Sequence, residues 1–295
     1  MTPKSSVNAR VVVGIATHNR CDELRKAVAS ALDQSHAPLR VTVIDDASSD
    51  GTSKLRDEFK NVSWERWEQA QGYVRARNKM MLTATEAYYV SLDDDSWFIR
   101  GDEIAIAVDY LERHPQAAAV AFDILAPDTP QPVPRGTRHS VGVFIGCGHV
   151  LRLRVVKLLG GYALFPGTYG CEEKDLCLRL IDAGYQIVKL DGVHVWHDKS
   201  ALARDLPRQH CSGVCNDLAL TLRRAPLAFL LPLLVWKVSS HLVFALKNGL
   251  LVSCLQGIWD FACAAAGLWR TRGPVRLAGL AQYRTLTRSP RQVAG

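Results

Sequence analysis

Up to about residue 200, the chain alternates short β-branched runs with segments whose apolar residues recur at helical spacing. Strands are expected at 10–15, 40–44, 62–67, 88–92, 118–122 and 186–190, with regular apolar spacing also at 141–145. Helices are expected around 24–32, from residue 51, and at 74–83, 102–113 and 172–183. This alternation predicts an α/β layer fold with a mostly parallel central sheet. The Pro-rich stretch at 126–136 breaks the pattern and is expected to be a loop.

The composition changes after about Asp205, where the chain becomes rich in Leu, Val, Ala and Trp. Polar residues interrupt the apolar runs before any reaches the ~18 residues that a spanning helix needs; they are Lys237, His241, Lys247 and Asp260. Basic residues near tryptophans instead predict amphipathic helices that lie in a membrane interface. An oligomerisation surface or a helical cap on the core is the alternative.

The charge distribution and the cysteine spacing bear on the partners and the cellular location of the protein. The net charge is +7, yet residues 206–295 alone hold 11 Lys or Arg against two Asp. This basic charge accompanies apolar segments rather than a nucleic-acid-binding signature, so we expect no nucleic acid partner. The eight cysteines show no disulfide-dense spacing, and residues 1–6 lack the apolar core of a secretory signal. A cytoplasmic location, peripheral on the inner face of the cell membrane, is therefore expected.

The first two strands end in polar sequences that could form a ligand crevice. Ala16 to Arg20 contains no glycine and so differs from the Gly-rich turn of a dinucleotide site. Asp45 to Gly51 gathers carboxylates and hydroxyls where parallel strands usually end at a ligand. These groups could bind ribose hydroxyls and a base, although Ser49-Asp50-Gly51 is also an ordinary turn and helix N-cap.

The strand at 88–92 leads directly into Asp93-Asp94-Asp95. Adjacent carboxylates repel one another, and a hard divalent cation such as Mg²⁺ or Mn²⁺ would stabilise them and bridge to a diphosphate. A solvated Asp-rich loop is the alternative reading.

Two further groups of residues could take part in chemistry. Glu172 and Glu173 begin a helix, where the helix dipole favours acids and where a carboxylate could act as a general base. Asp175 could pair with Arg179 at i,i+4 on the same helix. His194 and His197 follow the last strand, and a neutral imidazole is a competent ligand for Mn²⁺.

Taken in order, these motifs resemble those of family 2 glycosyltransferases over residues 10–200. They are Val13-Gly14-Ile15-Ala16-Thr17-His18-Asn19-Arg20, Val43-Ile44-Asp45-Asp46-Ala47-Ser48-Ser49-Asp50-Gly51-Thr52, Arg75-Ala76-Arg77-Asn78, Leu92-Asp93-Asp94-Asp95, and Glu172-Glu173-Lys174-Asp175-Leu176-Cys177-Leu178-Arg179-Leu180. The resemblance implies a GT-A fold in a catalytic domain at 1–205. The change in composition and charge predicts that a basic, apolar helical tail follows at 206–295. The resemblance also implies a divalent metal and inversion at the anomeric carbon.

The resemblance assigns a role to each matching position. A nucleotide-sugar site is implied for Thr17, Asn19, Arg20, Asp46, Arg77, Asn78, Asp93 and Asp94. Asp95 would be the metal ligand, with His197 as a further ligand. Glu173 stands at the usual position of the base, but the family more often has Glu-Asp there, so either Glu172 or Glu173 could serve.

The expected activity is transfer of a sugar from a nucleotide-diphosphate sugar to a saccharide or lipid-linked saccharide, as in surface polysaccharide or glycolipid synthesis. Nucleotidyl transfer is the competing enzymatic reading, but it normally needs a Gly-rich phosphate loop after the first strand. A nucleotide-sugar sensor or a membrane scaffold without catalysis is the non-enzymatic alternative. Neither the donor, the acceptor nor the oligomeric state follows from the sequence.

Overall fold

The computed structural model describes residues 9–129, 136–198 and 205–293, so residues 130–135 of the expected loop lie outside the described residues. The chain forms two compact units. The first comprises residues up to Gly161, residues 184–200 and the chain from Thr285 onward. The second comprises Tyr162–Ala183 and residues 201–284, so it includes a segment from before the expected start of the tail at residue 206.

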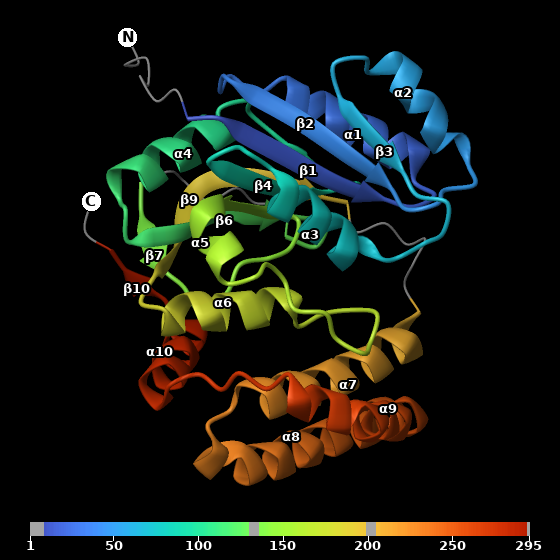
Figure 1. Ribbon diagram of the computed structural model, residues 1–295, viewed down its shortest axis with the longest axis vertical. Coiled ribbons are helices and arrows are strands. Elements are labelled where there is room, and N and C mark those ends of the chain that lie inside the picture. Colours follow the sequence, from blue (N-terminus) through green and yellow to red (C-terminus); the bar gives the residue numbers. More distant parts are fainter. Residues whose placement is uncertain (1–8, 130–135, 199–204, 294–295) are drawn as a thin grey trace. The chain divides into compact units, whose positions relative to one another are not determined.

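The first unit is built on one sheet with the strand order β10-β7-β9-β6-β8-β4-β1-β2-β3, and β5 pairs with β9 (Figure 1). The strands are β1 (Val11–Thr17), β2 (Leu39–Asp45), β3 (Ser63–Arg66), β4 (Tyr88–Asp93), β5 (Ser96–Phe98), β6 (Ala117–Leu125), β7 (Arg138–Ser140), β8 (Gly148–Arg152), β9 (Gln186–His197) and β10 (Arg291–Gln292).

The sheet is mixed rather than mostly parallel. The neighbours β3, β2, β1 and β4 are parallel, as are β6 and β9. Strand β8 lies between β4 and β6 and is antiparallel to both. The sequence pattern missed β8 because the apolar spacing at 141–145 comes just before it, in a segment that is not a strand.

Helices cover both faces of the sheet (Figure 1). One face packs against α1 (Cys21–Leu32) and α4 (Glu103–Arg113), whose apolar residues share a core with alternate residues of β1 such as Val11, Val13 and Ile15. Helices α3 (Tyr73–Thr83) and α5 (Leu153–Leu158) lie on the opposite side. A 3₁₀ turn at Gly51–Lys54 continues into α2 (Leu55–Glu58), so the helix expected from residue 51 is confirmed.

Gly14 in β1 is required by the packing of β4. A Cβ at Gly14 would lie 2.4 Å from Cε2 of Tyr89, a residue of β4 that is fully buried. No larger residue fits beneath this ring, because a real Cβ does not approach another atom so closely.

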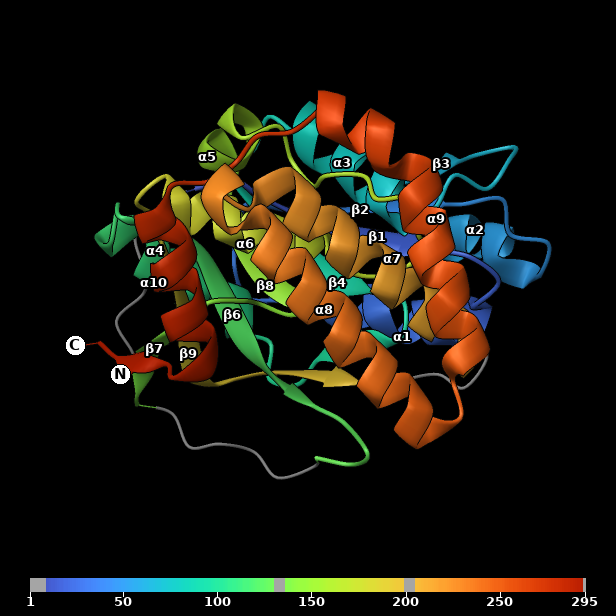
Figure 2. The ribbon, with the colours of Figure 1, turned by 90° about the horizontal axis from the view of Figure 1, so that it is seen from below.

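The second unit is helical and consists of α6 (Glu172–Asp182), α7 (Leu206–Arg224), α8 (Leu227–Asn248), α9 (Leu251–Arg270) and α10 (Leu277–Arg288), of which α10 belongs to this unit as far as Arg284. Helix α7 packs against both α8 and α9 (Figure 2). Their shared core includes Val214, Leu218, Ala245 and Cys254. The helical tail that the sequence predicted is therefore present.

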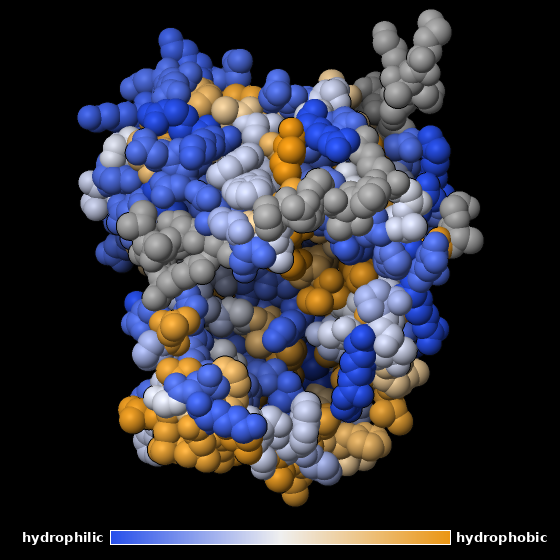
Figure 3. Space-filling view, turned by 180° about the vertical axis from the view of Figure 1, so that it is seen from behind, coloured by the Kyte–Doolittle hydropathy of each residue, from blue (hydrophilic) through white to orange (hydrophobic). Residues whose placement is uncertain are grey.

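Helices α8 and α9 present many apolar side chains to the outside, and hydrophobic residues gather at the lower end of the space-filling view (Figure 3). The large exposed residues of the two helices are Leu227, Phe229, Leu231, Val235, Trp236, Val243, Phe244, Leu246, Leu251, Val252, Leu255, Trp259 and Trp269. By length and composition both helices could also cross a membrane, which the interrupted apolar runs had argued against.

Two of the polar residues that interrupt α8 have a partner within the second unit. Lys237 Nζ lies 2.7 Å from Asp217 Oδ2, and His241 Nε2 lies 3.0 Å from the same oxygen. Asp217 belongs to α7, so these polar groups of α8 face the neighbouring helix. The ion pair and hydrogen bond with these two residues lower the pKa of Asp217 to about 2, against the opposing effect of burial.

Candidate functional site

The carboxyl ends of β1, β2 and β4 lie side by side in the first unit. The register pairs Thr17 with Asp45 across β1 and β2, and Ala16 with Asp93 across β1 and β4. The polar sequences that follow these strands therefore meet at one edge of the sheet, which is where open α/β sheets bind ligands.

The loops after β1 and β2 are held to each other by hydrogen bonds. The Asn19 backbone N–H donates to Ser48 Oγ at 2.9 Å, and the Ser49 N–H donates to Asn19 Oδ1 at 2.6 Å. Asn19 and Ala47 both have positive φ angles, 55° and 63°, which non-glycine residues rarely adopt. Such backbone is retained where a particular loop shape is needed.

Asp46 holds the start of α3. Its carboxylate accepts hydrogen bonds from the backbone N–H groups of Gln71 at 2.6 Å and Gly72 at 2.8 Å. The residue expected to bind the nucleotide thus also fixes the loop that leads into α3. Thr17, another expected contact, is buried at the end of β1, and its hydroxyl has no hydrogen-bond partner in the described part of the chain.

Arg77 connects α3 to the carboxylates that follow β4. Its guanidinium is buried, pairs with Asp93 Oδ1 and lies over the Tyr73 ring at 4.8 Å from the centroid. Asn78, one residue on, points elsewhere: its side-chain oxygen packs against Gly161, where a Cβ would come within 2.6 Å of it. The structure therefore joins Arg77 to the carboxylate cluster and places Asn78 against the loop after α5.

Arg20 links the loop after β1 to the other two aspartates. Its Nη1 lies 2.8 Å from Asp94 Oδ1 and 3.2 Å from Asp95 Oδ2. Burial raises the pKa of Asp94 to about 6, although the Arg20 charge opposes this shift. Asp94 is thus a buried partner of Arg20, while the Asp93 side chain remains 29% exposed.

His197 reaches the cluster through pairing of β5 with β9. The antiparallel register sets Ser96 opposite His197, and the Asp198 N–H donates to the Asp95 carbonyl at 2.9 Å. His197 Nε2 then lies 3.3 Å from Asp95 Oδ1. The two residues expected to hold a metal are therefore adjacent, whereas His194 is buried within β9.

Cys147 is a neighbour that sequence analysis missed. Its thiol, a carboxylate oxygen of Asp93 and a ring nitrogen of His197 all lie within 4.8 Å of one another. Burial and the nearby Asp93 raise the pKa of this thiol well above its usual range. No spacing in the sequence indicates it, because its position depends on the loop that leads into β8.

The donor set fits a divalent cation. It combines carboxylates, an imidazole and a thiol, all ligand types that transition-metal ions accept. The carboxylates Asp93, Asp94 and Asp95 share two guanidinium partners, Arg20 and Arg77, so negative charge is in excess at this edge of the sheet. Mg²⁺ prefers oxygen ligands alone, whereas transition-metal ions also accept the imidazole and the thiol.

The glutamates expected to supply the base lie in the second unit, on the first turn of α6. Glu172 is buried and Glu173 is partly exposed. Cys171 precedes them with φ = 81°, a left-handed conformation that turns the chain into the helix. The expected pair of Asp175 with Arg179 is confirmed at 2.7 Å, and Arg224 of α7 adds a second guanidinium to the same buried carboxylate.

Comparison with known proteins identifies the family. The profile described as glycosyl transferase family 2 matches residues 12–160, about half of the chain. The chain belongs to this family. TuaG of Bacillus subtilis (strain 168), described as a teichuronic acid biosynthesis glycosyltransferase, is 29% identical over 130 residues, which cover 41% of this chain and half the length of TuaG. The glycosyltransferase EpsE of the same organism is 26% identical over 202 residues, which cover 62% of this chain and 69% of EpsE.

Solved structures share the fold. A mannosyltransferase from Pyrobaculum calidifontis in complex with GDP-Man and Mn²⁺ aligns with a TM-score of 0.59 and 20% identity, over 96% of this chain and 84% of that one. S. aureus TarS 1–349 in complex with UDP-GlcNAc aligns with a TM-score of 0.63 and 15% identity, over 95% of this chain and 91% of that one. The expected GT-A fold is confirmed by these likenesses, with the mixed sheet described above.

Proposed function

We propose that the protein is an inverting glycosyltransferase that uses a nucleotide-diphosphate sugar and a divalent metal. Its acceptor is the hydroxyl of a saccharide or lipid-linked saccharide, in the synthesis of a surface polysaccharide or glycolipid. The observation that carries the proposal is the meeting of Asp93, Asp95 and His197 at the sheet edge formed by β1, β2 and β4. The solved relatives in complex with GDP-Man or UDP-GlcNAc support a nucleotide-sugar donor.

The residues at this edge suit a charged donor. A divalent cation held by Asp95 and His197 would neutralise charge on the leaving diphosphate. Thr17, Asn19 and Arg20 would line the nucleotide pocket with Asp46, and Arg77 would orient Asp93 toward the ribose or sugar through their ion pair. Asn19, Arg20, Asp46 and Arg77 are each held by hydrogen bonds or ion pairs to neighbouring groups, so these side chains need little reorganisation when the donor binds.

Glu173 or Glu172 would remove the proton from the acceptor hydroxyl as general base. The acceptor oxygen then bonds to the anomeric carbon while the bond from that carbon to the diphosphate oxygen breaks. Attack from the face opposite the leaving group inverts the anomeric centre. Partial exposure of Glu173 favours it, since the base must reach a bound substrate.

Helices α8 and α9 would bind the inner face of the cell membrane. Lys237 and His241 face Asp217 of α7, which leaves the exposed side of α8 largely apolar. A helix packed on one side and apolar on the other suits the membrane interface, and the basic residues of the tail suit anionic lipid.

Binding to vesicles that contain anionic lipid tests this proposal. We expect salt-sensitive binding by wild type and weaker binding by the double variant Trp236→Ser/Trp259→Ser. Leu158→Ser, which alters an exposed residue of α5, should bind as wild type does. Equal binding by all three proteins would refute this membrane contact.

The donor reaction provides the first test. Purified protein is incubated with UDP-, GDP- and dTDP-sugars and Mn²⁺ or Mg²⁺, and release of the nucleotide diphosphate is measured. We expect metal-dependent release with one donor and its loss in Asp95→Ala and Glu173→Gln. Tight nucleotide binding without release from any sugar would instead support a nucleotide-sugar sensor. Once an acceptor is found, NMR of the product anomer tests inversion.

A further inference from the structure

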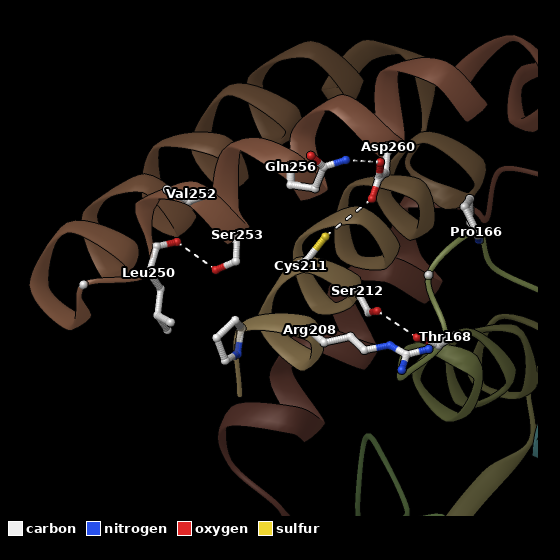
Figure 4. Close-up of a pocket in the computed structure, with 13 residues that line it drawn as sticks. Pro166, Thr168, Arg208, Cys211, Ser212, Leu250, Val252, Ser253, Gln256 and Asp260 are labelled. Atoms are coloured by element: carbon white, nitrogen blue, oxygen red, sulfur yellow. Dashed lines mark hydrogen bonds between the residues drawn. The ribbon is translucent and has the colours of Figure 1, made fainter. Parts of the chain in front are cut away.

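The second unit contains a pocket of about 590 Å³ between α7, α9 and the loop that precedes α6 (Figure 4). Arg208, Cys211 and Ser212 of α7 line one side, and Ser253, Gln256 and Asp260 of α9 line the other. The volume falls in the ~300–1,000 Å³ range of pockets that bind small molecules.

The pocket has a fixed shape. Helices α7 and α9 cross in backbone contact, since a Cβ at Gly257 would lie 2.4 Å from the Cys211 carbonyl oxygen. Asn216 of α7 is buried and ties down the loop at 167–170. Its Oδ1 accepts from Gly167 N–H at 2.7 Å, and its Nδ2 donates to the carbonyls of Gly167, Tyr169 and Gly170 at 3.1, 2.9 and 2.9 Å.

The same loop leads directly into α6. Pro166, Gly167 and Thr168 line the pocket, and Glu172 follows after the left-handed residue Cys171. A ligand held in the pocket is therefore bound by the rigid segment that positions the two candidate bases. On the proposed function, the substrate that must approach the base is the acceptor.

The lining indicates a neutral ligand rich in hydroxyl groups. Asp260 accepts from Gln256 Nε2 at 2.8 Å and from the Cys211 thiol at 3.4 Å, which fixes its carboxylate in the pocket. In the described part of the chain, the Arg208 guanidinium has no carboxylate partner, and Arg208 and Asp260 are the only charged residues of the lining. The lining thus carries one positive and one negative charge. It lacks the excess positive charge that binding of a diphosphate would need.

Hydroxyl groups match this lining because each can donate to a carboxylate and accept from a guanidinium or an amide. Thr168 Oγ1 and Ser212 Oγ, 3.1 Å apart, provide further hydroxyl partners. Pro166, Pro207 and Leu250 supply apolar surface for the ring faces of a sugar. We propose that this pocket binds the glycan part of the acceptor, as a neutral saccharide. This inference rests on the proposed function, whose acceptor it specifies.

Saturation-transfer NMR tests the proposal with defined probes: the methyl glycosides of glucose, galactose, mannose, N-acetylglucosamine and N-acetylgalactosamine, and their octyl counterparts. We expect wild type to bind at least one methyl glycoside without donor or metal. Asp260→Asn and Arg208→Gln should each weaken that binding about 10-fold, as expected for loss of a charge-assisted hydrogen bond. Tighter binding of the octyl glycoside would identify a lipid-linked glycan as the source, and equal binding a free one.

Asp22→Asn serves as the matched control, since it alters an exposed aspartate of α1 in the first unit and should bind the same glycoside as wild type does. Failure of wild type to bind any probe overturns the proposal, as does unchanged binding by both pocket variants with wild-type melting temperatures. The proposed function fails separately, when metal-dependent release of nucleotide diphosphate is absent although the glycoside binds. Where a bound glycoside also accepts sugar, Asp260→Asn should raise its KM and leave the donor KM unchanged.

Discussion

Nε2 of His197, at the end of β9, lies 3.3 Å from Oδ1 of Asp95, which follows β4. Their approach depends on the short strand β5, which directly follows the three aspartates in the chain and pairs with the end of β9. The metal ligands expected from two distant segments are thereby joined by backbone hydrogen bonds rather than by side-chain contact alone.

Replacing Asp95 by Asn should abolish most of the metal-dependent activity. The change removes a charged ligand and leaves His197 without its carboxylate neighbour, so we expect the rate of donor turnover to fall about 100-fold or more. Mn²⁺ affinity, measured by electron paramagnetic resonance, should fall in parallel. Asp22→Asn changes an exposed aspartate of α1 and should behave as wild type. Full Mn²⁺ affinity in Asp95→Asn would show that the metal binds elsewhere.

Cys147 should contribute a thiolate when a softer ion than Mg²⁺ occupies the cluster. Its thiol lies within 4.8 Å of the ligand atoms of Asp93 and His197, so Co²⁺ added to the wild type should give a thiolate-to-metal charge-transfer band. The band should be absent in Cys147→Ser and present in Cys263→Ser, which alters an exposed cysteine. A band that persists in Cys147→Ser would assign the thiolate to another residue.

Asp175 should contribute more to stability than an exposed aspartate does. Its side chain is 0% exposed and pairs with Arg179 and Arg224, so Asp175→Asn leaves two guanidinium groups short of a counter-charge. We expect a loss of about 3–5 kcal/mol in the free energy of unfolding, measured by urea denaturation. Asp22→Asn, in an exposed pair with Arg25, should cost less than about 1 kcal/mol. Similar losses in both variants would contradict this assignment.

The ion pairs of Asp217 should make the stability of the second unit sensitive to acid. The folded pKa of about 2 lies below the ordinary value of 3.8, so the stabilisation is present above about pH 4 and is lost as the pH falls toward 2. The difference in melting temperature between wild type and Asp217→Asn should therefore be largest near neutral pH and should shrink below pH 4. A difference that stays constant down to pH 2.5 would exclude an electrostatic origin.

Ala47→Gly should stabilise the first unit, because Ala47 has φ = 63°. Relief of the left-handed strain exceeds the entropic cost of glycine, and we expect a gain of about 0.5–1 kcal/mol in the free energy of unfolding. Ala29→Gly, at an exposed position inside α1, should cost about 1 kcal/mol under the same denaturation conditions. A loss of stability in Ala47→Gly would mean that its methyl group makes packing contacts that outweigh the strain.

The sequence was enough to predict side chains that lie close together in the chain and the motifs of a known family. It was not enough to predict contacts that depend on the pairing of distant strands or the packing of distant helices. The three aspartates stand next to a recognisable strand, and Asp175 and Arg179 are one helical turn apart, so both features could be predicted. Cys147 could not, because an antiparallel strand that the apolar pattern did not reveal places it at the site. Arg224 joins Asp175 only through packing of separate helices, which no local spacing encodes.

The Tyr89 ring above Gly14 also restricts the register in which β1 can pair with β4. The residues of β1 on the same side of the strand are Val12 and Ala16, and each carries the Cβ that the ring excludes at Gly14. Sliding β4 by two residues in either direction would bring the ring onto one of them. Since Asp93 is paired with Ala16 by this same alignment, a mismatch deep in the sheet would displace the aspartates at its edge. From inside the core, Gly14 thus helps to fix the position of the aspartates that follow β4.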